Sequence, residues 1–220
     1  MRHFQEELDD LQQRLLEMAG LVEAAIHGSV RSLVERDEAR AHQVLRNEDR
    51  INRMEIQIDD QATRLLALQQ PMAGDLRFLT AALKINNDLE RMGDLAVNVA
   101  ERSLSVMRYP AVKPLIDIPR MATLAESMVH NSLDAFVRRD RDLARWVLVS
   151  DDAVDELENS VREELVRFME SDPSTVPCAV GLMFIAHDLE RIADHATNIA
   201  EDVVYLVQGV DVRHHAEDRG

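Results

Sequence analysis

The sequence predicts an all-α protein built from two tandem three-helix bundles that are related by internal duplication. Composition, helical periodicity and a long-range repeat support this fold class. Of the 220 residues, 46% are hydrophobic and 30% are charged, while Gly occurs only 7 times and Pro only 6 times. Leu, Ala, Val, Glu, Asp and Arg dominate, and most of these residues favour helices over strands. The chain is long enough to bury substantial hydrophobic cores.

The repeat is clearest between residues 86–101 (NNDLERMGDLAVNVAE) and residues 186–201 (AHDLERIADHATNIAE). Nine of these 16 aligned positions are identical. Upstream the likeness continues at an offset of 103 instead of 100, as between Asp37 and Asp140. The second copy therefore has three residues fewer between its second and third segments. A period near 100 is too long for a solenoid repeat, so it indicates a duplicated domain.

Each copy divides into three segments with apolar residues at helical spacing. The predicted helices cover residues 4–35, 38–69, 74–107, 117–138, 141–171 and 175–208. Breakers separate them at Arg36-Asp37, Pro71, Gly74, Arg139-Asp140, Asp172-Pro173 and Pro177. Pro110 and Pro114 mark a linker, which places a first repeat at 1–110 and a second at 111–220. Long helices joined by tight turns predict antiparallel bundles.

The third helix of each copy carries a polar, mostly acidic strip about 80° wide. The first strip contains Asn87, Glu90, Asp94, Asn98 and Glu101, and the second contains His187, Glu190, Asp194, Asn198 and Glu201. The second helix adds another strip, formed by Glu48, Asn52, Glu55 and Asp59, whose counterparts are Asp151, Asp155, Glu158 and Arg162. If the second and third helices pack antiparallel, these strips converge.

Two interpretations of the strips stay open. Carboxylates are common on helix surfaces, and a solvated face with Glu/Arg pairs explains any single Glu-x-x-x-Asp. However, Glu and Asp four residues apart repel each other, and a bridging cation would offset that repulsion. Oxygen ligands suit Mg²⁺, Mn²⁺, iron or Ca²⁺, and Zn²⁺ less typically. His187 is either a surface residue or a further ligand, and Arg91 and Arg191 are expected to pair with the preceding glutamates.

Charge and cysteine content restrict the function classes. The net charge of −16 disfavours binding to nucleic acid and to anionic lipid, so any membrane association is expected through partners. Cys178 is the only cysteine and is interpreted as a core residue in a reducing cytoplasm. The acidic N-terminal segment does not resemble a signal peptide. The apolar run 177–186 is too short to span a bilayer, so we expect a cytoplasmic protein.

Several segments resemble the PhoU family: the two repeats given above, QPMAGDLR at 70–77, IN-x-x-E-x-x-ID at 51–59 and AEDVVYLVQGVDVRH at 200–214. The resemblance covers essentially the whole chain. It implies a cytoplasmic protein, often a homodimer, that regulates the high-affinity phosphate ABC transporter. It further implies that the partners are the transporter ATPase and a phosphate-sensing histidine kinase, which the protein holds in its inhibitory state when phosphate is plentiful.

The same resemblance implies divalent or trivalent metal ions (Fe, Mn, Mg or Zn) on Glu/Asp-x-x-x-Asp motifs. The matching residues are Glu55, Asp59, Glu90, Asp94, Asp155, Asn159, Glu190 and Asp194. Asn159 replaces an acid, and Arg162 stands where the first copy has Asp59, so we expect weaker binding in the second copy. The leading interpretation is a regulatory adaptor without catalytic machinery. A metal-dependent enzyme or metal store, and a purely structural bundle, are the alternatives.

Overall fold

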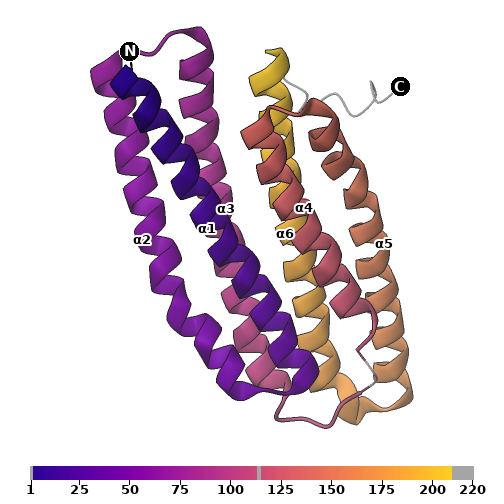
Figure 1. Cartoon of the computed structure of the whole chain (residues 1–220). Helices are drawn as coiled ribbons and strands as arrows, with labels where there is room; N and C mark the ends of the chain where they lie inside the picture. The colour runs from indigo at the N-terminus through magenta and orange to yellow at the C-terminus, as the bar shows by residue number, and fades with distance from the viewer. Residues whose placement is uncertain (1, 113–114, 210–220) are drawn as a thin grey trace.

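The computed structural model describes residues 2–112 and 115–209, and these form six long helices without a strand (Figure 1). The helices are α1 (Arg2–Glu35), α2 (Glu38–Gln69), α3 (Ala73–Val106), α4 (Asp117–Arg138), α5 (Arg141–Ser171) and α6 (Val176–Gln208). All six predicted helices are confirmed, with ends that differ by two residues at most. Pro114 and residues 210–214 of the family-like C-terminal segment lie outside the described residues.

The first turn of each repeat uses the same local device. Arg36 and Arg139 both adopt the left-handed conformation with φ of 53°, which ends the preceding helix. The Asp37 side chain then accepts a hydrogen bond from the backbone N–H of Arg40, and Asp140 accepts equivalent bonds at the start of α5. An Asp cap satisfies backbone donors that the first helical turn leaves unpaired. The Arg-Asp pairs are therefore helix breakers for a definite physical reason.

The second turn differs between the repeats, as the shift in offset predicts. In the first repeat, residues 70–72 join α2 to α3, and Gln70 has a positive φ of 45°. In the second, a short 3₁₀ helix, η1 (Pro173–Thr175), precedes α6, and Asp172 caps it. At the repeat offsets, α5 ends one residue earlier than α2 and α6 begins three residues later than α3. The missing residues are therefore taken from the helix ends, and the long helical faces stay in register.

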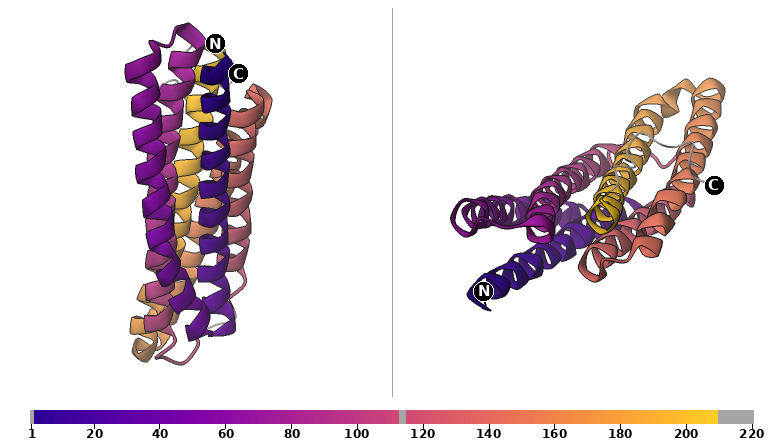
Figure 2. Two further views of the ribbon diagram at one scale, coloured as in Figure 1. Left: turned by 60° about the vertical axis from the view of Figure 1, so that its left-hand side comes forward. Right: turned by 90° about the horizontal axis from the view of Figure 1, so that it is seen from above.

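The two repeats pack side by side around an approximate two-fold axis, with α1 against α4 and α3 against α6 (Figure 2). Across the α1–α4 contact, His27 pairs with Glu126 and His130 pairs with Glu23, each at 3.4 Å. These four residues correspond at the repeat offset of 103, so the contact is reciprocal. One continuous hydrophobic core runs through both repeats. The aromatic stack of Phe78 on Phe136, with ring centroids 5.2 Å apart, joins the repeats within that core.

Two other expectations concern single features of the chain. Cys178 is buried at 2% exposure, as predicted for a core residue, and burial raises the pKa of its thiol. No helix in the described part of the chain is long and apolar enough to cross a membrane.

Candidate functional site

The acidic strips of α2 and α3 face each other along the contact between these helices, where Glu55 lies near Glu90 and Asp94. We call the surface along this contact the first acidic groove, and its counterpart between α5 and α6 the second acidic groove. Burial raises the pKa of Glu90, and the negative charges of Asp94 on the same helix and Glu55 on α2 raise it further. Arg91 opposes this shift through an ion pair with Glu90 at 3.6 Å, as predicted for the residue that follows the glutamate. The groove therefore holds carboxylates that repel one another and are partly removed from water.

The same groove continues toward the other end of α3. Burial raises the pKa of Glu48, and the next largest causes are the charges of Asp94, Asp49 and Glu101. The negative charge of Asp94 therefore raises the pKa of both Glu90 and Glu48. Asp59 is exposed one turn beyond Glu55, at the edge of this groove.

A buried amide that the sequence did not single out lies beside the first strip. Asn86 is only 1% exposed, and its side-chain N–H donates to the backbone carbonyl of Glu55 at 2.9 Å. Its Oδ1 is buried and has no hydrogen-bond partner. The corresponding residue in the second repeat is Ala186, so this oxygen is particular to the first groove. Its only sequence signal is a polar residue at the edge of an apolar face.

In the second repeat the strongest perturbation is at Glu190. Burial is the largest cause that raises its pKa to about 7, followed by the charges of Asp194 and Glu158. Its Oε2 is buried without a hydrogen-bond partner. His187 Nδ1 lies 3.4 Å from this oxygen and 3.3 Å from Glu158 Oε1, so the histidine faces the carboxylates although half of its side chain is exposed. It adds a nitrogen donor that the first groove lacks.

The structure distinguishes the predicted ligands of α5. Burial raises the pKa of Asp155, and the charges of Asp194 and Glu158 raise it further, so Asp155 lies within the second acidic groove. Asn159 is exposed, and its Oδ1 accepts a hydrogen bond from Arg162. Glu158, one residue earlier, faces α6 through His187. The α5 side of this groove is therefore formed by Asp155 and Glu158, while Asn159 lies outside it.

Within residues 2–112 and 115–209, no three His, Cys, Asp or Glu side chains are positioned as a ready metal-binding group. The donor chemistry of both grooves nevertheless suits a hard cation, because carboxylates from two helices are brought together and partly dehydrated. The buried oxygens of Asn86 and Glu190 that accept no hydrogen bond fit the same role, since buried polar atoms are normally hydrogen-bonded. Metal ligation by the predicted residues stays a prediction, with Glu158 and not Asn159 placed to take part on the α5 side.

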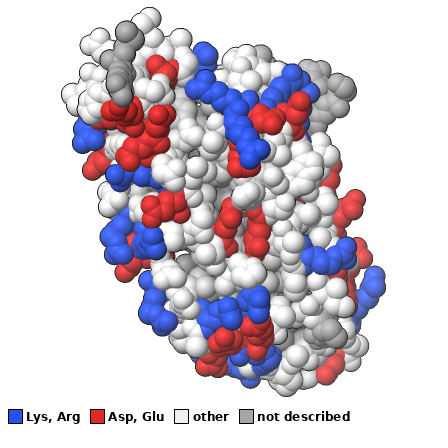
Figure 3. All heavy atoms as spheres, viewed as in Figure 1, with Lys and Arg blue, Asp and Glu red and all other residues white. Residues whose placement is uncertain are grey.

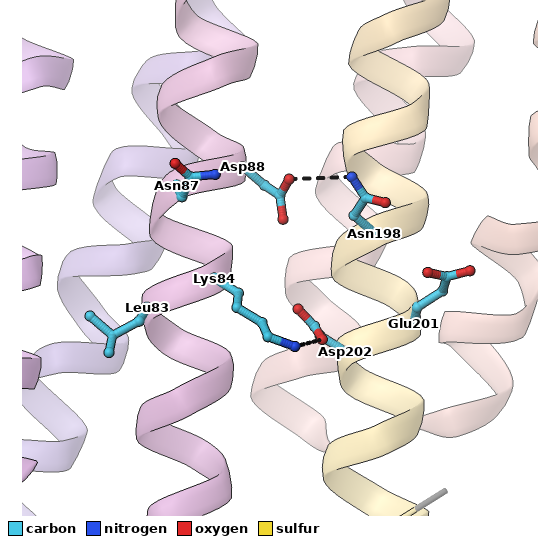
Figure 4. A pocket seen from close by; sticks show the side chains of 7 residues that line it. All are labelled: Leu83, Lys84, Asn87, Asp88, Asn198, Glu201 and Asp202. Atoms are coloured by element: carbon cyan, nitrogen blue, oxygen red, sulfur yellow. Dashed lines mark hydrogen bonds and ion pairs between the residues drawn. The ribbon is translucent and has the colours of Figure 1, made fainter. Parts of the chain in front are cut away.

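Polar contacts to buried aspartates join α3 to α6 and were not predicted; Figure 4 shows those of Lys84 with Asp202 and of Asp88 with Asn198. Lys84 pairs with Asp202 at 2.7 Å, and Arg102 donates to the buried Asp188. Asp88 lies 2.8 Å from His195 Nδ1 and also accepts from Asn198 at 3.4 Å. An open cleft of about 390 Å³ lies beside the first pair, lined by Leu83, Lys84, Asn87, Asp88, Asn198, Glu201 and Asp202.

The repeat itself carried a signal for two of these residues. Asp88 and Asp188 are identical in the two copies, yet each lies about 120° around the helix from the middle of the acidic strip. An acid that recurs on the apolar side of a helix is expected to have a buried partner, because an isolated buried charge is costly. The sequence did not show that the partners come from the other repeat.

Comparison with known proteins agrees with this geometry. The PhoU domain matches the chain twice, at residues 15–103 and 118–203. The phosphate-specific transport system accessory protein PhoU homolog of Pseudomonas aeruginosa is 40% identical over 214 residues, which cover 97% of this chain and 88% of that protein. The protein of the same name from Aquifex aeolicus is 38% identical over 215 residues and 97% of each chain.

Two solved structures are similar along nearly the whole chain. The crystal structure of PhoU from Pseudomonas aeruginosa has a TM-score of 0.91 at 39% identity and covers 94% of this chain and 100% of that one. The phosphate transport system regulatory protein PhoU from Streptococcus pneumoniae has a TM-score of 0.88 at 28% identity, covering 95% of this chain and 99% of that one. The paired three-helix repeats are therefore shared with these structures.

Proposed function

Because this chain belongs to the PhoU family, we propose that it is an accessory regulator of phosphate-specific transport. In this proposal the protein works in the cytoplasm as a negative regulator of the phosphate-starvation response. It links the ATPase of the high-affinity phosphate ABC transporter to a phosphate-sensing histidine kinase. The names of its relatives describe accessory and regulatory proteins of phosphate transport, and they support a role beside the phosphate transporter.

The observation that carries the proposal further is the pair of acidic grooves, one in each repeat. Burial and like charge raise the pKa of both Glu90 and Glu190, so each groove favours a species that neutralises its carboxylates. A metal cation supplies that neutralisation. The residues that would hold it are Glu55, Asp59, Glu90 and Asp94 in the first repeat, and Asp155, Glu158, Glu190 and Asp194 in the second.

The bound cation would act by changing which partners this surface accepts. A surface with a net charge of −16 repels acidic proteins and anionic headgroups. Cations in the grooves cancel part of that charge locally and offer bridging positions to carboxylates or phosphates of a partner. Metal occupancy and partner binding are then coupled, because each stabilises the other. This role requires neither a catalytic base nor bond-making chemistry.

The proposal is tested by comparing two variants of equal charge. Glu90→Gln/Asp94→Asn removes acidic ligands of the first groove, whereas Glu156→Gln/Glu163→Gln neutralises two exposed acids on α5. We expect only the first variant to lose Mn²⁺ binding by calorimetry and to capture less transporter ATPase and kinase. Capture that is normal in both variants, with and without chelator, contradicts a metal-dependent docking surface.

A genetic test addresses regulation separately from metal binding. Deletion of the gene is expected to derepress phosphate-starvation genes in phosphate-rich medium, and the wild-type gene should restore repression. Normal alkaline phosphatase in the deletion strain contradicts the regulatory role. Rapid turnover of iron with dioxygen by the purified protein would instead support the competing metal-enzyme or metal-storage function.

A further inference from the structure

Helix α2 presents charges of opposite sign on two opposite edges. The acidic strip with Glu48 and Glu55 faces α3. On the opposite side of the helix, a second row of six polar residues lies within about 40° of Arg46 when viewed down the helix axis. Its members are Arg46, Arg50, Arg53, Gln57, Asp60 and Arg64. Four of these six residues are arginines and one is an aspartate, so the row is positively charged in a chain with a net charge of −16. Figure 3 shows Lys and Arg alternating with Asp and Glu along the side of the molecule that α2 occupies.

This arginine edge borders a groove between α1 and α2. Two adjoining depressions of about 510 and 480 Å³ lie along it, and both are lined by Asp10, Arg14 and Gln57. Arg50 and Arg53 line the first depression, and Arg64 lines the second. We call this surface the arginine groove. Its guanidinium and amide groups are well suited to anions, because Arg binds carboxylates and phosphates through paired N–H donors.

Some of these arginines have partners within the protein and others do not. Arg14 pairs with Asp10 at 2.9 Å, and Arg50 pairs with Glu17 at 2.8 Å. Arg53 and Arg64 are exposed, and neither has a hydrogen bond or ion pair with any described residue. Each depression therefore contains one guanidinium that is free to bind an external anion.

The second repeat provides an internal comparison. At the offset of 103, Arg46, Arg50 and Arg53 correspond to Val149, Ala153 and Glu156, while Arg64 corresponds to Arg167. The second repeat has the same fold as the first although it lacks this row of arginines. The arginine row is therefore not required by the helical scaffold.

We propose that the arginine groove binds an acidic segment of a partner protein. Arg53 and Arg64 are 11 residues apart, which corresponds to about 16 Å along the helix. Asp10 lines both depressions and is paired with Arg14, and Asp60 lines the second depression, so carboxylates separate the free positive charges of Arg53 and Arg64. The groove thus fits two separate carboxylate groups on an extended chain, about five residues apart. A continuous polyanion, such as polyphosphate, would pass over Asp10 and meet its charge. This inference is independent of metal binding in the acidic grooves.

A fluorescent peptide serves as the probe. It carries two Glu-Glu pairs separated by four neutral residues, so that the nearest glutamates are five residues apart, and its control carries Gln-Gln pairs. Binding to the full chain is measured by anisotropy at low and at physiological salt. We compare Arg53→Gln/Arg64→Gln with Arg145→Gln/Arg167→Gln, which removes the same charge from exposed positions on α5. Circular dichroism verifies that both variants are folded.

We expect the α2 variant to bind the Glu peptide about tenfold more weakly and the α5 variant less than about twofold more weakly. The Gln peptide should not bind detectably. Equal losses in the two variants, or no saturable binding of the Glu peptide to the wild-type chain, overturn the proposal. Tighter binding of polyphosphate of matched length, of inorganic phosphate or of phosphatidylserine vesicles also overturns it, because the occupant would then be a phosphate group.

Discussion

The two repeats share their helices and first turns but differ in the charges that they present. The first repeat has a carboxylate groove on one side of α2 and the arginine groove on the other. The second has His187 among its carboxylates, Arg162 in place of Asp59, and no row of arginines on α5. Since both repeats keep the same scaffold, these differences are not needed for folding. They indicate that the duplicated surfaces have acquired different binding properties.

The contact between α3 and α6 shows how such differences are accommodated in the interior. Lys84 and Asp202 form an ion pair on one side of the approximate two-fold axis. The corresponding positions on the other side are Phe184 and Arg102, and the Arg102 guanidinium lies 5.2 Å from the centre of the Phe184 ring. Both members of the pair differ between the two sides, so an ion pair on one side is replaced by a cation–π contact on the other. Because Arg102 also donates to Asp188, this side contains the more deeply buried charge.

The largest effect is expected from breaking this buried pair. Arg102→Ala leaves Asp188, only 3% exposed, without its cationic partner. Burial already raises the pKa of Asp188, and Arg102 is the first charge that opposes this shift. We expect a loss of about 3–5 kcal/mol in the free energy of unfolding, measured by urea denaturation, because an uncompensated charge stays buried.

The corresponding pair on the other side supplies the control. The Lys84–Asp202 pair is slightly more exposed than the Arg102–Asp188 pair, with side chains 39% and 8% exposed against 33% and 4%, so Lys84→Ala is expected to cost somewhat less. Adding Asp188→Asn to Arg102→Ala should recover part of the lost stability. A larger loss for Lys84→Ala than for Arg102→Ala would contradict this order.

These interior pairs also show where sequence-based prediction ends. Helix positions, the Arg-Asp turns and the acidic strips follow from local periodicity and capping, so they were predicted from single segments. The partners of Asp88 and Asp188 depend on which faces of α3 and α6 meet, which no single helix specifies. The resemblance to the family motif implied Asn159, whereas helical spacing placed Glu158 on the strip, and in the structure Glu158 contacts His187 of α6. That Asn86 Oδ1 is buried without a hydrogen bond could be seen only in the folded structure, because its burial depends on how α2 packs on α3.

Metal preference is expected to separate the two grooves next. His187→Asn gives the second repeat the residue that the first has at position 87. On a Glu90→Gln/Asp94→Asn background, we expect this change to weaken Zn²⁺ binding about tenfold, because imidazole is a better ligand for Zn²⁺ than an amide. Mn²⁺ binding, which relies on oxygen donors, should change by less than about twofold. Equal changes for both metals in calorimetry would show that His187 is not a ligand.

The stability of the metal-free protein is expected to fall as pH rises. The pKa of Glu190 is about 7 in the folded protein and 4.5 without burial, so the folded state takes up the proton more readily. This contribution is fully present below pH 4.5 and is lost as the pH passes 7. Urea denaturation in chelator should show a loss on the order of 1 kcal/mol between pH 5 and 7.5. Glu190→Gln should reduce this loss, and an unchanged slope contradicts the assignment.

The smallest effect concerns packing between the second and third helices of each repeat. A Cβ added to Gly93 would lie 3.2 Å from two side-chain carbons of Ile51, which is a tight contact. The second repeat has Ala193 and Val154 at the corresponding positions, so a larger residue on one helix goes with a smaller one on the other. Gly93→Ala gains up to about 1 kcal/mol of helix propensity but overpacks Ile51.

A double-mutant cycle isolates this contact. We expect Gly93→Ala and Ile51→Val each to destabilise the protein by less than about 1.5 kcal/mol in urea denaturation. The double variant, which reproduces the packing of the second repeat, should be more stable than the sum of the single changes by about 0.5–1 kcal/mol. The reverse exchange, Ala193→Gly with Val154→Ile, should show coupling of the same sign. Additive effects in both repeats would mean that Gly93 is not held by Ile51, since a shared contact is what makes neighbouring substitutions non-additive.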